Sequence, residues 1–141
     1  MNVLIDTNVI LDNLLERAPD TEYADRIFDL CSSERLKGYV AAHAILNAYY
    51  IMRKHFPDEE RRRALLDICK MVLIVGTDER MIVDALKYDD FRDFEDCVVA
   101  KCSESCKADY IITRNVKDFA ESSVRAITPE EFLELGKEKT E

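Results

Sequence analysis

Carboxylate and amide side chains gather in three short segments whose residue types could do chemistry. They are Leu4-Ile5-Asp6-Thr7-Asn8, Asp93-Phe94-Glu95-Asp96 and Thr113-Arg114-Asn115-Val116-Lys117-Asp118. Carboxylates brought together repel one another and raise their own pKa values, and a divalent cation relieves that repulsion. Mg²⁺ prefers oxygen ligands and keeps several waters; it can activate water and stabilise charge on phosphate oxygens. The segments therefore predict a metal site suited to phosphodiester hydrolysis without a protein nucleophile.

Each segment also has a purely structural interpretation. Asp6 could cap a following helix, Asp93 and Asp96 have the spacing of a capping box, and Asp118 could be a solvated turn residue. Asp6 is the hardest to explain in this way, because it directly follows an apolar run and would lie at the edge of a sheet. Taken one by one, the segments leave both interpretations open.

Short apolar runs alternate with helical patterns along the chain and would position these segments. The runs that indicate strands cover 3–5, 39–41, 71–75, 110–112 and 124–127, and the run 71–75 is the clearest buried strand. The helical patterns cover 9–15, 23–31, 45–52, 57–70, 78–88, 93–107 and a C-terminal segment opened by Thr128-Pro129-Glu130-Glu131. This alternation predicts an α/β fold with a mostly parallel sheet covered on both faces. In such sheets ligands bind beyond the carboxyl ends of the strands.

Size, charge and cysteine usage narrow the class of protein. The 141 residues carry no repeat or linker, so we expect a single domain over 1–141. A formal net charge of −9 argues against coating nucleic acid by bulk electrostatics, although an enzyme could still hold one phosphate through a metal. No apolar run approaches the roughly 20 residues that span a bilayer, and the N-terminus lacks a basic signal region. Five cysteines without a CxxC pair predict reduced thiols in a cytoplasmic protein.

Taken in order, the motifs resemble the PIN domain over nearly the whole chain. The resemblance rests on an apolar strand ending in Asp-Thr-Asn, on Asp-Phe-Glu-Asp, and on Ala108-Asp109-Tyr110-Ile111-Ile112-Thr113-Arg114-Asn115 continued to Asp118-Phe119; the segment from Thr128 to Leu133 is similar to one bacterial branch. It implies a three-layer α/β/α sandwich around a mostly parallel central sheet, and a Mg²⁺- or Mn²⁺-dependent ribonuclease. Many bacterial members are VapC-type toxins of toxin–antitoxin pairs, often dimeric and held inactive by a partner protein.

Carried over by position, the resemblance assigns roles to individual residues. Asp6, Asp96 and Asp118 match the metal-binding acids, with Asp93 or Glu95 in reserve, and Thr113 matches the hydroxyl that orients water or a carboxylate. The remaining residues expected to bind or orient the substrate are Asn8, Asn47, Arg114 and Asn115, with Arg114 ranked first among RNA contacts. The chain departs from the family at Asn47, where a glutamate is usual, and at Asn115, where an aspartate is frequent. Asparagine offers a carbonyl oxygen to a metal but no negative charge.

These departures keep other functions open. A PIN fold with a weakened site could bind nucleic acid without cutting it, or its acidic surface could meet a basic protein. Nothing in the sequence reads a 2′-hydroxyl, so DNA stays open beside RNA. Tyr49 and Tyr50 could stack bases, although one of them falls on the apolar stripe of its predicted helix, and the basic run 53–55 lies close to Asn47.

Overall fold

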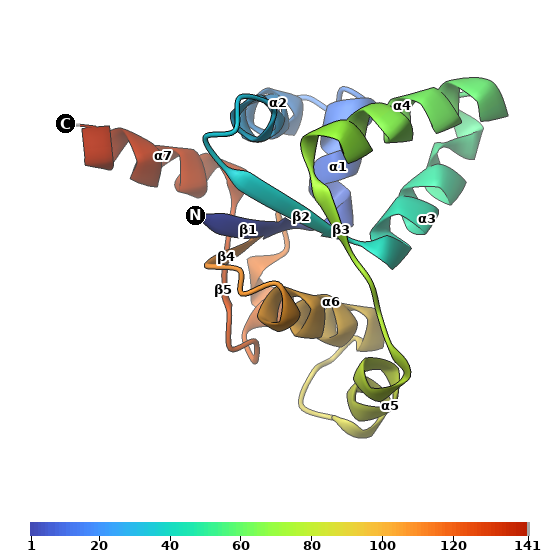
Figure 1. Ribbon diagram of the computed structural model, residues 1–141, viewed down its shortest axis with the longest axis vertical. Coiled ribbons are helices and arrows are strands. Elements are labelled where there is room, and N and C mark those ends of the chain that lie inside the picture. The colour runs from blue at the N-terminus through green and yellow to red at the C-terminus, as the bar shows by residue number, and fades with distance from the viewer. Residues whose placement is uncertain (141) are drawn as a thin grey trace.

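Five parallel strands form the central layer of the computed structural model, which describes the backbone of residues 1–140 and the side chains of residues 1–136. The order across the sheet is β3-β2-β1-β4-β5. The strands are β1 (Asn2–Ile5), β2 (Lys37–Ala41), β3 (Leu73–Val75), β4 (Tyr110–Ile112) and β5 (Arg125–Ile127). The expected parallel sheet is confirmed, and β1, the first strand in sequence, lies at its centre (Figure 1).

Helices cover both faces of this sheet. They are α1 (Thr7–Leu14), α2 (Asp20–Ser32), α3 (Ala42–Ile51), α4 (Asp58–Met71), α5 (Glu79–Lys87), α6 (Phe94–Ser105) and α7 (Pro129–Thr140), with 3-10 turns η1 (Met52–Lys54) and η2 (Val116–Phe119). Figure 1 shows α1 to α4 on one side of the sheet and α5 and α6 on the other, which gives the expected three-layer α/β/α sandwich. None of the described helices is long and apolar enough to cross a membrane.

The predicted helix starts are built from local capping chemistry. The carboxylate of Asp78 accepts a hydrogen bond from the backbone N–H of Met81 at 2.9 Å and opens α5. The hydroxyl of Thr128 accepts from the N–H of Glu131 at 3.1 Å at the start of α7. Such side-chain oxygens satisfy backbone donors that lack partners in a first helical turn, which is why the sequence marks these boundaries well.

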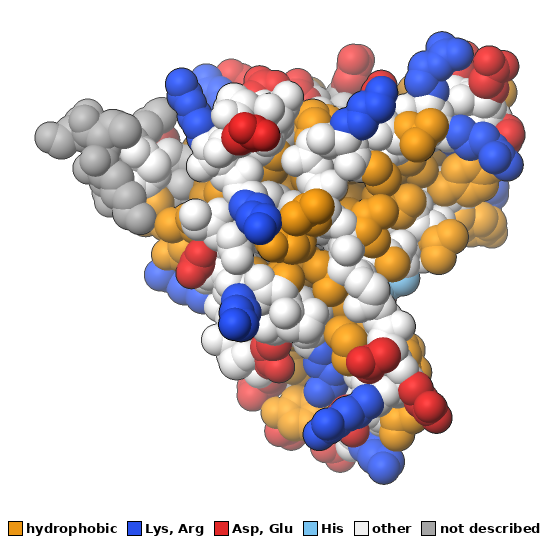
Figure 2. Space-filling view, in the orientation of Figure 1, with side chains coloured by type: hydrophobic (Ala, Val, Ile, Leu, Met, Phe, Trp, Pro, Cys, Tyr) orange, Lys and Arg blue, Asp and Glu red, His pale blue; other side chains and the backbone are white. Residues whose placement is uncertain are grey.

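The run that looked most like a buried strand is an edge strand instead. Met71 still belongs to α4, and in β3 the side chains of Leu73 and Ile74 are each 50% exposed. The prediction of a fully buried strand at 71–75 was wrong because β3 pairs only with β2, at the margin of the sheet. Figure 2 shows apolar side chains gathered on the face that carries β2 and β3.

The registers of the central strands decide where the polar segments meet. Ile5 in β1 lies opposite Ile112 in β4, so the residues that follow, Asp6 and Thr113, leave neighbouring strands at the same edge. The backbone N–H of Asp6 donates to the carbonyl oxygen of Ile112 at 3.0 Å, which extends the ladder to the point where both chains turn away. Two of the three polar segments are therefore adjacent at the carboxyl edge of the sheet, as expected for a ligand site in a parallel sheet.

Candidate active site

Asp6 is the buried centre of the polar edge. Its side chain is 7% exposed, and it stands between β1 and α1 as the N-cap of that helix. One carboxylate oxygen accepts from the N–H of Thr7 at 2.8 Å, and the other accepts from the hydroxyl of Thr113 at 2.9 Å. Burial raises the pKa of Asp6, and these two hydrogen bonds oppose that rise by stabilising the charged form. The cap and the candidate metal ligand are thus one residue, and the two interpretations do not exclude each other.

A hydrogen-bonded ring fixes the orientation of this carboxylate. The fully buried hydroxyl of Thr113 donates to Asp6 and accepts from the amide of Asn8 at 3.2 Å and from the N–H of Asn115 at 3.0 Å. The Asn8 amide also reaches Asp6 at 3.3 Å, and its oxygen accepts from the N–H of Arg114 at 3.2 Å. Residues from the first and third sequence segments are therefore locked together, and Asn8 and Thr113 lie where an orienting role requires them.

Asp96 brings a second carboxylate from the first turn of α6. Burial raises its pKa to about 7, and the negative charges of four neighbouring acids add to that rise: Asp93, Asp6, Asp118 and Glu95. Asp93 caps α6 by accepting from the N–H of Asp96 at 3.0 Å, so its capping interpretation is confirmed. Among the described residues, no side chain donates a hydrogen bond to the Asp96 carboxylate. The ionised form of Asp96 is consequently disfavoured by burial and by repulsion from the other acids.

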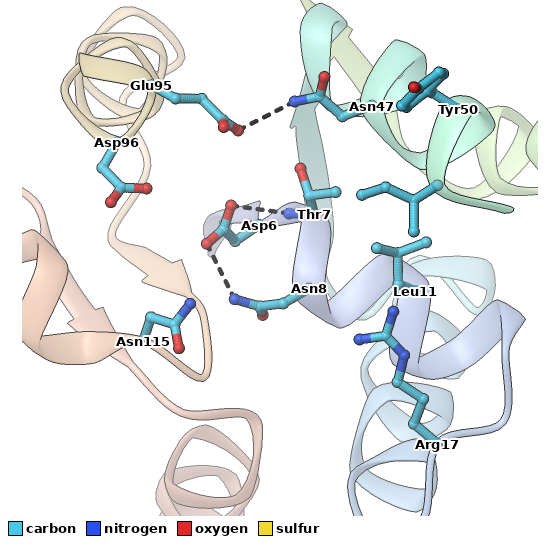
Figure 3. A pocket seen from close by; sticks show the side chains of 11 residues that line it. Asp6, Thr7, Asn8, Leu11, Arg17, Asn47, Tyr50, Glu95, Asp96 and Asn115 are labelled. Atoms are coloured by element: carbon cyan, nitrogen blue, oxygen red, sulfur yellow. Dashed lines mark hydrogen bonds between the residues drawn. The ribbon is translucent and has the colours of Figure 1, made fainter. Parts of the chain in front are cut away.

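Both carboxylates line a cavity of about 400 Å³. Its walls are formed by Asp6, Thr7, Asn8, Leu11, Arg17, Asn47, Tyr50, Ile51, Glu95, Asp96 and Asn115. In Figure 3, Asp6 lies at the centre, with Asp96 and Asn115 across from it on neighbouring elements. Asp118, on η2, is half-buried and outside this wall, although its charge reaches Asp96.

The chemistry of the donors fits a hydrated hard cation. The described residues contain no group of three or more His, Cys, Asp or Glu side chains placed to hold one metal ion, so binding through three carboxylates stays a prediction. Mg²⁺, however, is commonly held by one or two carboxylates and several waters. The buried hydroxyl of Thr7 lines the same cavity and has no hydrogen-bond partner in the described part of the chain. Such a buried polar atom calls for a water or ligand beside the carboxylates.

Arg114 is oriented differently from what its position in the sequence suggested. Its guanidinium donates two hydrogen bonds, at 2.6 and 3.2 Å, to the carboxylate of Asp12, whose side chain is 1% exposed. Arg114 lines a separate hollow with Asp20 and Tyr23 and is absent from the cavity beside Asp6. The sequence reasoning missed Asp12, and the available signal was an acid among the apolar residues of α1. Arg114 ties the segment after β4 to α1 and is poorly placed as the first RNA contact.

Asn47 and Glu95 meet across the cavity. The amide of Asn47 on α3 donates to the Glu95 carboxylate on α6 at 3.2 Å (Figure 3). Nε2 of His43 lies 3.7 Å from the same carboxylate. Glu95 faces the carboxylate of Asp6 closely enough to raise its pKa. Asn47 on α3 brings no negative charge to the cavity, but the Glu95 carboxylate from α6 lies beside it and supplies one. Arg17, which also lines the cavity, carried no signal in the sequence.

In a parallel three-layer domain, two carboxylates with raised pKa values near the carboxyl ends of the central strands lie where this architecture usually binds its ligand. The family model described as "PIN domain" matches residues 2–117. The chain belongs to the PIN-domain family.

Solved structures share this fold at low sequence identity. VapBC-1 from nontypeable Haemophilus influenzae is 19% identical, with a TM-score of 0.69 over 92% of this chain and 99% of that one. A toxin–antitoxin complex from Klebsiella pneumoniae is 18% identical, with a TM-score of 0.67 over 90% and 97%. The Mycobacterium tuberculosis sarcin–ricin loop cleaving toxin VapC20 is 12% identical, with a TM-score of 0.67 over 84% and 94%. Comparison with curated protein sequences gives no significant match.

Proposed function

We propose that this protein is a divalent-metal-dependent endoribonuclease that hydrolyses phosphodiester bonds of RNA. The observation that carries the proposal is the pair formed by Asp6 and Asp96, two carboxylates with raised pKa values that line one cavity. Folding brings these charges together although they repel each other, and an arrangement of that kind marks a functional site more often than a structural one. Membership of the PIN-domain family supports the same class of reaction.

Asp6 and Asp96 would hold Mg²⁺ or Mn²⁺. Asp118 lies close enough for its negative charge to raise the pKa of Asp96, so it would also attract the bound cation. The bound ion would supply an activated water and neutralise charge developing on the phosphate oxygens. Asp96 has a pKa of about 7 before any cation binds, so it is partly protonated near neutral pH and would release that proton when it binds the ion. Thr113 and Asn8 keep the Asp6 carboxylate in one orientation. Asn115 presents an exposed amide at the cavity wall that can donate to a phosphate oxygen.

We also propose that the chain acts as the toxin of a toxin–antitoxin pair in the cytoplasm. Solved toxin–antitoxin and VapBC complexes share its fold, which supports an antitoxin partner and is compatible with a homodimer. The five cysteines are free thiols, as expected in a reducing compartment. A net charge of −9 favours a partner segment that is basic.

A second function is favoured by one feature of the site. Asn47 and Asn115 leave fewer charges at the cavity than a fully acidic site would have, and no described group of three acids is placed to hold an ion. A PIN domain with these properties could recognise nucleic acid or a protein partner without cutting RNA. Cleavage in the presence of metal separates the two functions.

The deciding experiment is calorimetric titration of Mn²⁺ and Mg²⁺ into the native chain, Asp6→Asn and the control Asp67→Asn. Asp67 is an exposed acid on α4 that does not line the cavity. We expect binding by the native chain and the control, and its loss in Asp6→Asn, followed by metal-dependent RNA cleavage with the same pattern. Equal metal binding by Asp6→Asn would refute the assignment of the site. Metal binding without cleavage of any RNA tested would favour the non-catalytic function.

A further inference from the structure

Tyr50 forms part of the cavity wall and is unusually open for an aromatic residue. It lies near the end of α3 with a side chain that is 61% exposed, and it lines the cavity that also contains Asp6 and Asp96. In Figure 3 its ring stands beside Asn47, on the side of the cavity opposite α6. An exposed ring of this size gains little from packing, so its place next to the carboxylates calls for another explanation.

Arg53 stacks on this ring. The centre of its guanidinium lies 3.7 Å from the ring centroid, and the guanidinium donates to the carbonyl oxygen of Tyr50 at 2.8 Å. The guanidinium and the ring are thus stacked on each other at the surface, and this arrangement forms without a ligand. A planar cation on an aromatic ring offers a surface on which a nucleobase can stack.

The neighbouring tyrosine is committed to internal contacts. The hydroxyl of Tyr49 donates to the carboxylate of Asp58, and Arg61 covers its ring at 4.2 Å from the centroid. Arg61 also donates to the carbonyl oxygen of Tyr49 at 3.1 Å, which ties α4 to α3. Only one of the two adjacent tyrosines is therefore free for a ligand, and it is the one that faces the cavity.

The distribution of charge points to the same edge. Arg17 lines the cavity, and Arg53 and Lys54 lie exposed on η1 beyond Tyr50. In a chain with a net charge of −9, a polyanion is repelled overall, so it must be bound through local cations and stacking instead of a broad basic surface.

We propose that Tyr50 and Arg53 form a subsite for an unpaired nucleobase whose backbone phosphate reaches the cavity. The subsite requires an unpaired base at this one position of the substrate, because a base inside a duplex is already stacked on both faces and cannot reach the pair. This inference rests on the proposed nuclease function and specifies what that function acts on.

The test is fluorescence anisotropy with a labelled single-stranded RNA of about ten nucleotides, a length within the site sizes of single-strand binders, in EDTA and at low salt. Removing a stacking ring weakens binding by about 1–3 kcal/mol, or roughly 5- to 150-fold. We expect a loss of about tenfold or more for Tyr50→Ala, little change for Tyr50→Phe, and a smaller loss for Arg53→Gln. Tyr88→Ala is the matched control, since Tyr88 is an exposed tyrosine at the end of α5. The same RNA in a blunt duplex should compete poorly.

Equal affinity of Tyr50→Ala and the native chain, or no binding of the single strand by the native chain, would overturn the subsite. Duplex competition as strong as that of the single strand would overturn the requirement for an unpaired base. Failure of the proposed nuclease function would give another result. The native chain would then bind the single strand through Tyr50 but not cleave it with Mn²⁺, which supports the subsite and refutes the nuclease function. If the native chain cleaves RNA and Tyr50→Ala does so with an unchanged KM, the nuclease function is retained and the subsite is overturned.

Discussion

The carboxylate of Asp96 should destabilise the folded chain whenever no cation is bound. Burial and neighbouring negative charges raise its pKa from 3.8 to about 7, so the folded protein tolerates the ionised form poorly. Replacing Asp96 with Asn removes the charge while keeping the size of the side chain. Among the described residues the carboxylate accepts no hydrogen bond, so none is lost. We therefore expect Asp96→Asn to be more stable than the native chain in EDTA.

The size of the effect follows from the pKa shift. A rise of about 3 units corresponds to about 4 kcal/mol at 1.36 kcal/mol per unit, and because Asp96 is only half-buried, solvent screening reduces this to about 2 kcal/mol. The folded-state pKa lies above the unfolded one, so ionisation costs stability progressively between about pH 4 and pH 7 and the loss is constant above that. The native chain should lose stability across this window, and Asp96→Asn should lose less.

Urea unfolding in EDTA at pH 8 and pH 5 measures the difference. We expect Asp96→Asn to exceed the native chain by about 2 kcal/mol at pH 8 and by about half as much at pH 5. The control Asp67→Asn replaces an exposed acid and should change little at either pH. Millimolar Mn²⁺ should stabilise the native chain and not the variant, which reverses the order. A variant that is equally or less stable than the native chain at pH 8 would refute the reasoning, because the carboxylate would then not be under strain.

Three further substitutions test contacts around the site and the core. Asp12→Ala removes the acceptor of two hydrogen bonds from Arg114 and leaves that guanidinium the more distant carboxylate of Asp20, at 3.8 Å, so it should lower the free energy of unfolding by about 2 kcal/mol; a loss below about 0.5 kcal/mol in urea unfolding, which is typical of surface changes, would mean that the pair is unimportant. Thr113→Val removes the hydroxyl that orients the Asp6 carboxylate, our proposed metal ligand, and should weaken Mn²⁺ binding about tenfold in calorimetry, with an unchanged affinity as the contrary result. Gly38→Ala would place a Cβ 2.7 Å from the sulfur of Cys31 and should lower the free energy of unfolding by about 1–3 kcal/mol. Adding Cys31→Ala should recover part of that loss, and no recovery would locate the clash elsewhere.

The spacing of apolar residues and the capping residues were enough to predict most of the fold from the sequence. Strands and helices alternate as expected, and Asp78, Asp93 and Thr128 begin the helices that their side chains predicted. These features are local, so they can be read from a few neighbouring residues. The burial of β3 could not be read in this way, because an apolar run does not reveal whether its strand has one neighbour or two.

That the candidate site residues lie close together was predictable from the sequence, and the directions of their side chains were less so. The sequence identified Asp6, Asp96 and Thr113, which the fold brings close together. It ranked Arg114 as a substrate contact, although the side chain turns toward the buried Asp12. The direction of a long side chain depends on a partner about a hundred positions away, and nothing in the local sequence encodes that partner. The roles of Asp118 and Asn115 stay predictions until metal binding is measured.

The hydrogen bond between Asp6 and Thr113 joins residues 107 positions apart, and its geometry has a consequence for the growing chain. The central strand β1 is synthesised first, yet one of its neighbours, β4, is completed only at Ile112. Contacts of such long range form late, because closing the loop loses entropy before the contact rewards it. A nascent chain that has not yet released β4 from the ribosome cannot orient Asp6. The order of the strands thus delays the assembly of the site until most of the polypeptide has been made.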